Sequence, residues 1–262
     1  DMMIVKICGT GSGIPVKIMD NDDLSNMVDT NDAWIRERTG VEKRHIAESE
    51  STVSMAVEAG RQALAQTGIR PEELDMIVVS TMSPDAVLPC TACEVQKAIG
   101  AEGAVCFDLQ AACTGFIFAY NTAQAYIQSN MCRTVLLIGS ERLSRLVDWT
   151  DRGTCILFGD GAGAAVLKAA EGRAYLPVSH SDGKKGEALT CDRYIHMDGR
   201  AVFQFAVTRV PEVIREVLTK NELLMDDIDY FVLHQANRRI VEAVAKRLRQ
   251  PIEKFPMNLQ EY

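Results

Sequence analysis

The sequence has no uninterrupted apolar run of the roughly 18–20 residues that a membrane-spanning helix requires. It also lacks the succession of charged, apolar and small residues that forms a secretory signal peptide. Both absences argue against a membrane or secreted protein. The sequence therefore predicts a cytoplasmic protein that does not act within a membrane.

An excess of positive charge is missing as well. The chain carries 28 Lys and Arg against 36 Asp and Glu, which gives a formal net charge of −8. A general nucleic-acid binder needs a positive field that releases counterions, so we predict no nucleic-acid partner. With 47% hydrophobic and 24% charged residues, the chain is too apolar for disorder. Its 262 residues predict one large fold or two packed halves.

Spacings typical of metal ligands are also scarce. Of the eight cysteines only Cys90 and Cys93 form a close pair, and no second pair or paired histidines accompany them. The pair does not open a thioredoxin-like unit either. We therefore predict no metal site, and we interpret most cysteines as small buried apolar residues.

Short apolar runs alternate with amphipathic segments along the chain. The predicted strands are residues 3–7, 76–79, 104–107, 134–138 and 230–233. The predicted helices are residues 52–67, 90–99, 114–128, 208–220 and 237–249. The strands are typical of a sheet that helices cover on both faces. The helix at 114–128 is almost entirely apolar or small, so we expect it to be buried on every side.

An internal repeat relates two parts of the chain. Residues 63–80 align without a gap on residues 217–234. Such self-similarity predicts two halves of one topology, an N-terminal half at 1–170 and a C-terminal half at 171–262. Because the first half continues well beyond its matching point, we expect the second half to be incomplete after Tyr262.

Cys113 stands where a predicted strand passes directly into the apolar helix at 114–128. At a helix N-terminus, unpaired amides and the macrodipole favour a thiolate. The small neighbours Ala111, Ala112 and Gly115 permit a sharp elbow. This setting predicts a nucleophile, with a packed core cysteine as the alternative.

His234 follows the predicted strand at 230–233 and precedes a helix. Open α/β sheets place their sites at such strand ends. The repeat aligns His234 with Ser80, at the end of another predicted strand. A structural histidine is the alternative interpretation.

Two glycine-rich segments do not support a phosphate-binding interpretation. Gly9, Gly11 and Gly13 follow a strand, but the third glycine is misplaced for a dinucleotide motif. Pro15 also discourages the helix that would receive the phosphates. Residues 159–163 lie between apolar runs, and we expect a glycine-rich hairpin turn there.

Five separated motifs carry more specific information. They are Asp-Ala-Trp-Ile-Arg-Glu-Arg-Thr-Gly at 32–40, Ala-Ala-Cys-Thr-Gly-Phe at 111–116, Thr-Asp-Arg-Gly-Thr at 150–154, Phe-Gly-Asp-Gly-Ala-Gly-Ala at 158–164 and His-Gln-Ala-Asn-Arg-Arg-Ile at 234–240. In this order, over the whole chain, they resemble the β-ketoacyl-[acyl carrier protein] synthase III family. Members of that family are the initiating condensing enzymes of type II fatty acid synthesis, within the thiolase superfamily.

The resemblance implies the five-layered αβαβα thiolase-like fold, with two pseudo-symmetric halves, in an obligate homodimer. It also implies a Cys-His-Asn site in which Cys113 takes an acyl group from acyl-CoA. His234 and the asparagine would assist the decarboxylation of malonyl-[acyl carrier protein]. That asparagine belongs to a Gly-Asn-Thr-Ser motif, which the printed sequence does not contain. Asn237 belongs to the motif that His234 opens and is expected among the substrate-binding residues instead.

The implied chemistry suits these residue types. A thiolate attacks a thioester readily, and loss of CO₂ from the malonyl group leaves an enolate that a donor such as His234 can stabilise. The resulting carbanion attacks acyl-Cys113, which gives 3-oxoacyl-[acyl carrier protein]. No metal or redox cofactor is required, because acyl-CoA is a substrate.

The resemblance further places Trp34 and Arg152 on the two faces of the CoA adenine. Leu88, in the loop at 82–89, stands where the family often carries a large aromatic ring. We expect it to wall the partner's acyl pocket and to admit primers longer than acetyl. Basic residues of the helix at 237–249 are expected to dock the acidic carrier protein. They are Arg238, Arg239, Lys246 and Arg249.

Two alternatives stay open on the sequence alone. The first is another thiolase-fold synthase, such as a polyketide-type ketosynthase or a hydroxymethylglutaryl-CoA synthase. The second is a non-catalytic carrier-docking subunit, which the presence of both Cys113 and His234 disfavours.

Overall fold

The computed structural model describes residues 2–262, and their contacts divide the chain into two compact units. The first unit comprises residues 2–17, His45–Leu143 and Asp160–Tyr175. The second unit comprises Ile18–Arg44, Ser144–Gly159 and Leu176–Tyr262. Each unit has hydrophobic clusters of its own.

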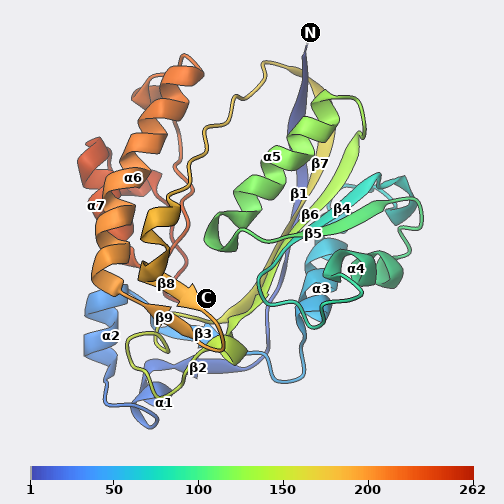
Figure 1. Cartoon of the computed structure of the whole chain (residues 1–262). Coiled ribbons are helices and arrows are strands. Elements are labelled where there is room, and N and C mark those ends of the chain that lie inside the picture. The colour runs from blue at the N-terminus through green and yellow to red at the C-terminus, as the bar shows by residue number, and fades with distance from the viewer. Residues whose placement is uncertain (1) are drawn as a thin grey trace. The chain divides into compact units, whose positions relative to one another are not determined.

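A five-stranded sheet forms the centre of the first unit (Figure 1). In spatial order its strands are β1 (Met2–Gly13), β7 (Asp160–Gly172), β6 (Thr134–Arg142), β4 (Met76–Ser80) and β5 (Val105–Leu109). Strand β4 runs parallel to β5 and β6, whereas β7 runs antiparallel to β6 and β1. All of β4 is buried, as expected for a strand that is covered on both faces. The four strands predicted in this unit are therefore confirmed.

Helices cover both faces of this sheet (Figure 1). Helices α3 (Thr52–Ala65) and α4 (Thr91–Ile99) pack on the face to which Ile77 points. Helix α5 (Gly115–Gln128) packs on the face to which Met76 points. Because side chains alternate along β4, this one strand contributes to two separate hydrophobic clusters.

The prediction that α5 is buried on every side is wrong. Its small residues Gly115, Ala119 and Ala123 are buried against the sheet, whereas Phe116 and Ile117 are exposed, Ile117 by 54%. An apolar composition does not reveal how many faces of a helix are covered. In the first unit, α5 has the sheet on one side only.

Glycines allow β1 to approach α3 closely. A Cβ atom on Gly11 would lie 2.2 Å from the carbonyl oxygen of Ala59, and one on Gly13 would lie 2.1 Å from that of Met55. Any side chain at these positions would collide with the helix backbone, so the glycines serve strand–helix packing. Strand β1 continues to Gly13, beyond the predicted strand at 3–7.

The hairpin turn predicted at 159–163 is wrong. Gly161 and Gly163 lie within β7, and they pair with β1 on one side or β6 on the other. The chain turns earlier, where the N–H of Cys155 donates to the carbonyl oxygen of Asp151 at 3.0 Å. Glycine is a turn signal only where the backbone is not paired along both edges.

The second unit combines short strands with four helices. Strand β2 (Ile18–Asp20) pairs with β3 (Lys43–His45), and β8 (Leu189–Cys191) pairs with β9 (Ile195–Met197). The helices are α1 (Asn21–Ser25), α2 (Asp32–Thr39), α6 (Gly199–Lys220) and α7 (Arg238–Leu248). Short 3₁₀ turns along the whole chain are Pro71–Glu73, Ala112–Thr114, Leu143–Leu146, Gly183–Ala188, Met225–Asp227 and Ile252–Lys254.

The strand predicted at 230–233 does not form. The N–H of Phe231 donates to the carbonyl oxygen of Lys254 at 2.8 Å, but no strand among residues 2–262 pairs with the segment. Val232 is consequently 77% exposed. An apolar run becomes a strand only when a neighbouring backbone satisfies its amides and carbonyls.

The two repeated segments adopt the same local structure where a helix ends. Helix α3 is followed by Gly68 at φ +70°, and α6 by Glu222 at φ +55°, which are aligned positions of the repeat. The next turn closes in the same way, since Arg70 and Leu224 each donate a backbone N–H to the acidic side chain three residues ahead, at 2.9 and 2.7 Å. The domain limits that the repeat suggests stay a prediction.

Candidate active site

Cys113 lies in the 3₁₀ turn Ala112–Thr114, between the end of β5 and the start of α5. Ala112 adopts φ +46°, a left-handed conformation that is unfavourable for a residue with a side chain. Beyond the turn, a Cβ atom on Gly115 would lie 2.1 Å from Ser80 Oγ. The strained alanine and the close approach of the glycine hold Cys113 on a sharp elbow, as its small neighbours predicted.

The thiol of Cys113 is exposed, yet its pKa is raised above the usual thiol value. Desolvation by the surrounding protein is the main cause, and the nearby carboxylate of Glu141 adds to it. This desolvation opposes the helix N-terminus, which the sequence predicted to favour a thiolate, and that expectation stays a prediction. Acylation requires the loss of the thiol proton.

Glu141 is a neighbour of Cys113 that the sequence analysis missed. Its Oε1 accepts the backbone N–H of Met82 at 2.7 Å, and its Oε2 accepts the hydroxyl of Ser83 at 2.5 Å. It thereby fixes the loop that follows β4. The available signal was an acidic residue near the carboxyl end of a buried strand, where α/β sheets place their sites.

The loop at 82–89 is anchored in its middle and exposed near its end. The carboxylate of Asp85 accepts the backbone N–H groups of Thr52 at 3.1 Å and Val53 at 2.8 Å, at the start of α3. Leu88 is 82% exposed. The anchor fixes the path of the loop and presents Leu88 at the surface.

His234 lies in the second unit, in the irregular segment before α7. Its side chain reaches solvent, but desolvation by the surrounding protein lowers its pKa, so the ring is neutral at pH 7. The next polar residue, Gln235, accepts the backbone N–H of Asn258 at 2.8 Å. Asn237 caps α7, because its Oδ1 accepts the N–H of Ile240 at 2.9 Å.

Trp34 and Arg152 meet in the second unit, as the resemblance implies. The Cζ atom of Arg152 lies 5.2 Å from the centroid of the Trp34 ring, and that of Arg38 lies 4.6 Å from it. Arg152 also donates to the carbonyl oxygen of Asp29 at 3.0 Å. Arg38 was not among the predicted site residues, although a residue four positions after Trp34 on a helix lies beside it. We call Trp34, Arg38 and Arg152 the clamp.

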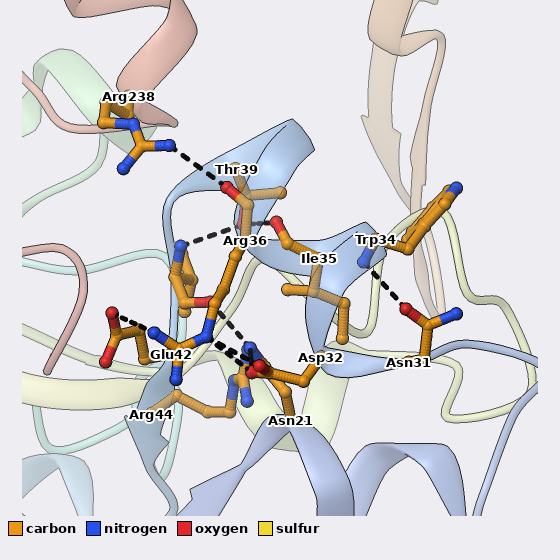
Figure 2. Close-up of polar contacts among 11 residues, drawn as sticks. Asn21, Asn31, Asp32, Trp34, Ile35, Arg36, Thr39, Glu42, Arg44 and Arg238 are labelled. Carbon is orange, nitrogen blue, oxygen red and sulfur yellow. Dashed lines mark hydrogen bonds and ion pairs between the residues drawn. The ribbon is translucent and has the colours of Figure 1, made fainter.

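The segment that leads into α2 contains a cap and a buried polar atom without a partner. Asn31 caps α2, since its Oδ1 accepts the N–H of Trp34 at 2.8 Å (Figure 2). Just before it, Thr30 Oγ1 is buried and has no hydrogen-bond partner within residues 2–262. An unsatisfied buried hydroxyl is costly, so it marks a point where a bound molecule can supply a hydrogen bond.

Two of the predicted docking residues have partners on other parts of the second unit. Arg238 donates to the carbonyl oxygen of Arg36 at 3.3 Å (Figure 2) and lies 3.5 Å from the carboxylate of Glu242. The Cζ atom of Arg239 lies 5.9 Å from the centroid of the Phe203 ring. Both side chains are largely exposed at the start of α7.

The other two docking residues lie at the far end of α7. Lys246 is exposed in its last turn. Arg249 lies outside the helix, which ends at Leu248, and it adopts a left-handed φ of +54°. The helix predicted at 237–249 therefore ends one residue earlier than expected, and Arg249 is its C-cap.

The prediction that most cysteines are buried is wrong. Only Cys132 and Cys155 are buried, whereas Cys191 is exposed like Cys113 and the other four, Cys8, Cys90, Cys93 and Cys106, are half-buried. Within residues 2–262, no group of three or more His, Cys, Asp or Glu side chains is arranged to hold a metal ion. The described helices also include none that combines the length and the apolar character needed to cross a bilayer.

Solved structures place this fold among the condensing enzymes. The 3-oxoacyl-[acyl-carrier-protein] synthase III of Aquifex aeolicus VF5 matches with a TM-score of 0.97 and 43% identity, over 98% of this chain and 85% of that one. The priming β-ketosynthase of the R1128 polyketide pathway matches with a TM-score of 0.94 and 33% identity, over 100% of this chain and 83% of that one. The chain therefore has the thiolase-like α/β fold of an acyl-condensing enzyme, with a cysteine elbow at the expected place.

Sequence comparisons narrow the class to one family. Residues 107–183 match the family described as 3-oxoacyl-[acyl-carrier-protein (ACP)] synthase III, and residues 218–262 match its C-terminal part. The β-ketoacyl-[acyl-carrier-protein] synthase III of Clostridium novyi is 45% identical over 278 aligned residues, which cover 100% of this chain and 86% of that protein. The chain belongs to the β-ketoacyl-[acyl-carrier-protein] synthase III family. It is an acyltransferase condensing enzyme that initiates fatty acid synthesis, and the alternatives left open by the sequence are not favoured.

Proposed function

We propose that Cys113 accepts an acyl group from acyl-CoA and passes it to the carbon nucleophile formed from malonyl-[acyl carrier protein]. CO₂ and CoA leave, and 3-oxoacyl-[acyl carrier protein] is the product. The observation that carries this proposal is the strained elbow, which holds an exposed thiol at the start of α5. Membership of the family supports the same reaction.

The acylation step begins with the loss of the thiol proton to solvent, because the raised pKa keeps Cys113 protonated at rest. The thiolate then attacks the thioester carbonyl, and the CoA thiolate leaves and takes up a proton. A rate limited by the small thiolate fraction should rise with pH.

The condensation step relies on His234. Loss of CO₂ from the malonyl group leaves an enolate, and the neutral ring of His234 can donate a hydrogen bond to its oxygen. The lowered pKa supports this role, because the ring stays neutral at pH 7. The enolate carbon then attacks the acyl carbonyl, and the Cys113 thiolate leaves and regains a proton.

The nucleotide end of acyl-CoA is proposed to bind at the clamp. Trp34 offers an aromatic face, and Arg152 offers a planar guanidinium that stacks on a nucleobase. In the resting chain the Arg152 side chain is half-exposed, so it can move outward to admit adenine.

The carrier protein is proposed to dock on the basic residues at α7, with Arg239 foremost and Arg238, Lys246 and Arg249 around it. Their positive charge complements an acidic partner in a chain whose net charge is −8. The substrate-side role predicted for Asn237 stays part of the proposal, although its side chain also caps α7.

A homodimer and a cytoplasmic location, both expected at the sequence level, remain part of this proposal, as does a reaction without a metal or redox cofactor. Strand β5 supports the dimer, because it lies at the edge of its sheet with Val105 61% exposed. An exposed edge of this kind is a ready surface for pairing with another chain. The exposed Leu88 is proposed to reach the acyl pocket of the partner.

Measuring acyl transfer and condensation separately distinguishes the proposed role of Cys113 from that of His234. Cys113→Ala should abolish transfer of labelled acetyl from acetyl-CoA to the protein. His234→Ala should still form the acyl-enzyme but lower the condensation rate by roughly 10²–10³, the usual effect of losing one such donor. Cys191→Ala, which removes an exposed thiol elsewhere, serves as the matched control. Undiminished condensation in Cys113→Ala would refute the proposal.

A further inference from the structure

A chain of hydrogen bonds connects α2, the helix that carries Trp34, to Asn21 and Arg44 (Figure 2). Asp32, in the first turn of the helix that carries Trp34, accepts the side-chain N–H of Asn21 at 2.9 Å. The Oδ1 atom of Asn21 accepts from the guanidinium of Arg44 at 2.9 Å. The same nitrogen of Arg44 donates to the carbonyl oxygen of Ile156 at 3.1 Å.

This chain links the two segments that carry the walls of the clamp. At one end, Asp32 and Trp34 share α2. At the other end, Ile156 closely follows the turn that begins at Asp151 and contains Arg152. The turn is rigid, because the N–H of Gly153 donates to Asp151 Oδ1 at 2.9 Å and further backbone bonds close it.

The burial of Arg44 is unusual for a residue with a purely structural role. It is only 2% exposed, and its hydrogen bonds go to neutral oxygens, which belong to Met19, Asn21 and Ile156. Its Nε atom has no partner within the described residues. Burial lowers its pKa to about 10, so it is still charged at neutral pH. A buried charge held in this way is a weak source of stability, and its value lies more in fixing one arrangement of its neighbours.

Apolar packing supplies a competing explanation. Leu24, Ile35 and Ile156 form a buried cluster against which Trp34 packs, so this cluster alone can hold the two segments together. The two explanations differ in what the polar chain does. If packing suffices, breaking one polar link changes overall stability without a selective effect on the nucleotide.

We propose that Asn21 and Arg44 are positioning residues for nucleotide binding. They fix α2 against the turn at 151–157, so that Trp34 is held in place opposite Arg152, whose side chain moves outward to admit adenine. The proposal rests on the proposed binding of the CoA nucleotide at the clamp. It predicts that Asn21 and Arg44 affect the affinity for CoA and not the chemical steps.

Asn21→Asp breaks one link and preserves the other. A carboxylate at this position still accepts from Arg44, so the buried charge keeps its partner. It can no longer donate to Asp32 or to the carbonyl oxygen of Val41, and it faces the carboxylate of Asp32 instead. Arg44→Lys is the second variant, because a single ammonium cannot reproduce the planar fork that reaches several acceptors.

The test measures CoA binding by calorimetry and steady-state kinetics with acetyl-CoA, on the full protein. Asn21→Asp should raise the Kd for CoA about tenfold, which corresponds to about 1.4 kcal/mol. The KM for acetyl-CoA should rise similarly, while kcat at saturation stays within about twofold. With acetyl-pantetheine, which lacks the nucleotide, variant and parent should have the same kcat/KM. Glu212→Gln, on the exposed surface of α6, is the control.

Each outcome decides between the explanations. If Asn21→Asp binds CoA like the parent while Trp34→Ala binds it weakly, the positioning role is wrong and the nucleotide site stands. If Trp34→Ala also binds CoA like the parent, the proposed nucleotide site itself is wrong. If Asn21→Asp lowers kcat/KM equally with acetyl-pantetheine, its role is merely structural and the inference is overturned. If Asn21→Asp does not fold, the same comparisons with Arg44→Lys decide.

Discussion

The guanidinium carbon of Arg152 lies 5.2 Å from the centroid of the Trp34 ring, although the two residues come from distant parts of the sequence. An adenine between them needs van der Waals contact on both faces, which is about 7 Å in total at roughly 3.5 Å per contact. In the proposed binding, the nucleotide therefore replaces this contact: Arg152 would move outward on its flexible side chain, while Trp34 would stay in place on α2.

Removing this guanidinium should weaken the binding of acyl-CoA. We expect Arg152→Ala to raise the KM for acetyl-CoA about 5- to 20-fold, since stacking and cation–π contacts of this kind are worth roughly 1–2 kcal/mol. The kcat at saturation should change little. Arg193→Ala, which removes another guanidinium stacked on an aromatic ring in the same unit, is the matched control. An unchanged KM in Arg152→Ala would contradict the assignment of this residue.

The raised pKa of Cys113 predicts how its reactivity depends on pH. A group whose pKa is raised loses its proton only at higher pH, so the midpoint of alkylation by iodoacetamide should lie above the usual thiol value of about 8.5. Glu141→Gln removes the nearby negative charge and should move this midpoint downward. Glu102→Gln, on an exposed loop, should leave it unchanged. Alkylation mapped to Cys113 with a midpoint at or below that of a free thiol would contradict the prediction.

Leu88 should make primer selection permissive. A flexible aliphatic side chain leaves more room than an aromatic ring, so we expect kcat/KM values for isobutyryl- and hexanoyl-CoA comparable to that for acetyl-CoA. Leu88→Phe should favour acetyl-CoA by a graded amount, since one methylene changes discrimination by only about 1–3 kcal/mol. Val16→Phe tests whether any exposed aromatic ring has this effect, because Val16 is equally exposed in the same unit. Strict acetyl selectivity of the parent would refute the idea.

The basic residues at α7 should act on the carrier protein and not on CoA. We expect Arg239→Glu to raise the KM for malonyl-[acyl carrier protein] at least several-fold, with a smaller effect at high salt because exposed charges are screened. The KM for acetyl-CoA should stay the same. Arg209→Glu places the same charge change on α6 as a control. Equal effects of the two substitutions would argue against a local docking surface.

The sequence predicted the elbow at Cys113 well, because its determinants are local. An apolar strand, a run of small residues and an apolar helix follow one another there. It could not predict the raised pKa of Cys113. That property depends mainly on desolvation by the folded protein and, to a lesser extent, on Glu141, which comes from another strand of the sheet.

Predictions also failed where the local structure depends on pairing with a distant segment of the chain. The apolar run at 230–233 has strand character, but no described strand pairs with it. The glycines at 161 and 163 indicated a turn, whereas pairing with β1 and β6 keeps them extended. Nothing in the sequence distinguishes Arg44 from other arginines. Only the fold shows that it is buried and that it connects three segments.

Mass-spectrometric mapping of the acyl-enzyme tests the central claim most directly. The full protein is incubated with acetyl-CoA in the absence of malonyl-[acyl carrier protein], quenched in acid and digested. We predict one acetyl group on the peptide that contains Cys113, and none on that peptide in Cys113→Ala. Acetyl on Cys106, Cys155 or any other cysteine, or undiminished labelling of Cys113→Ala, would contradict the account.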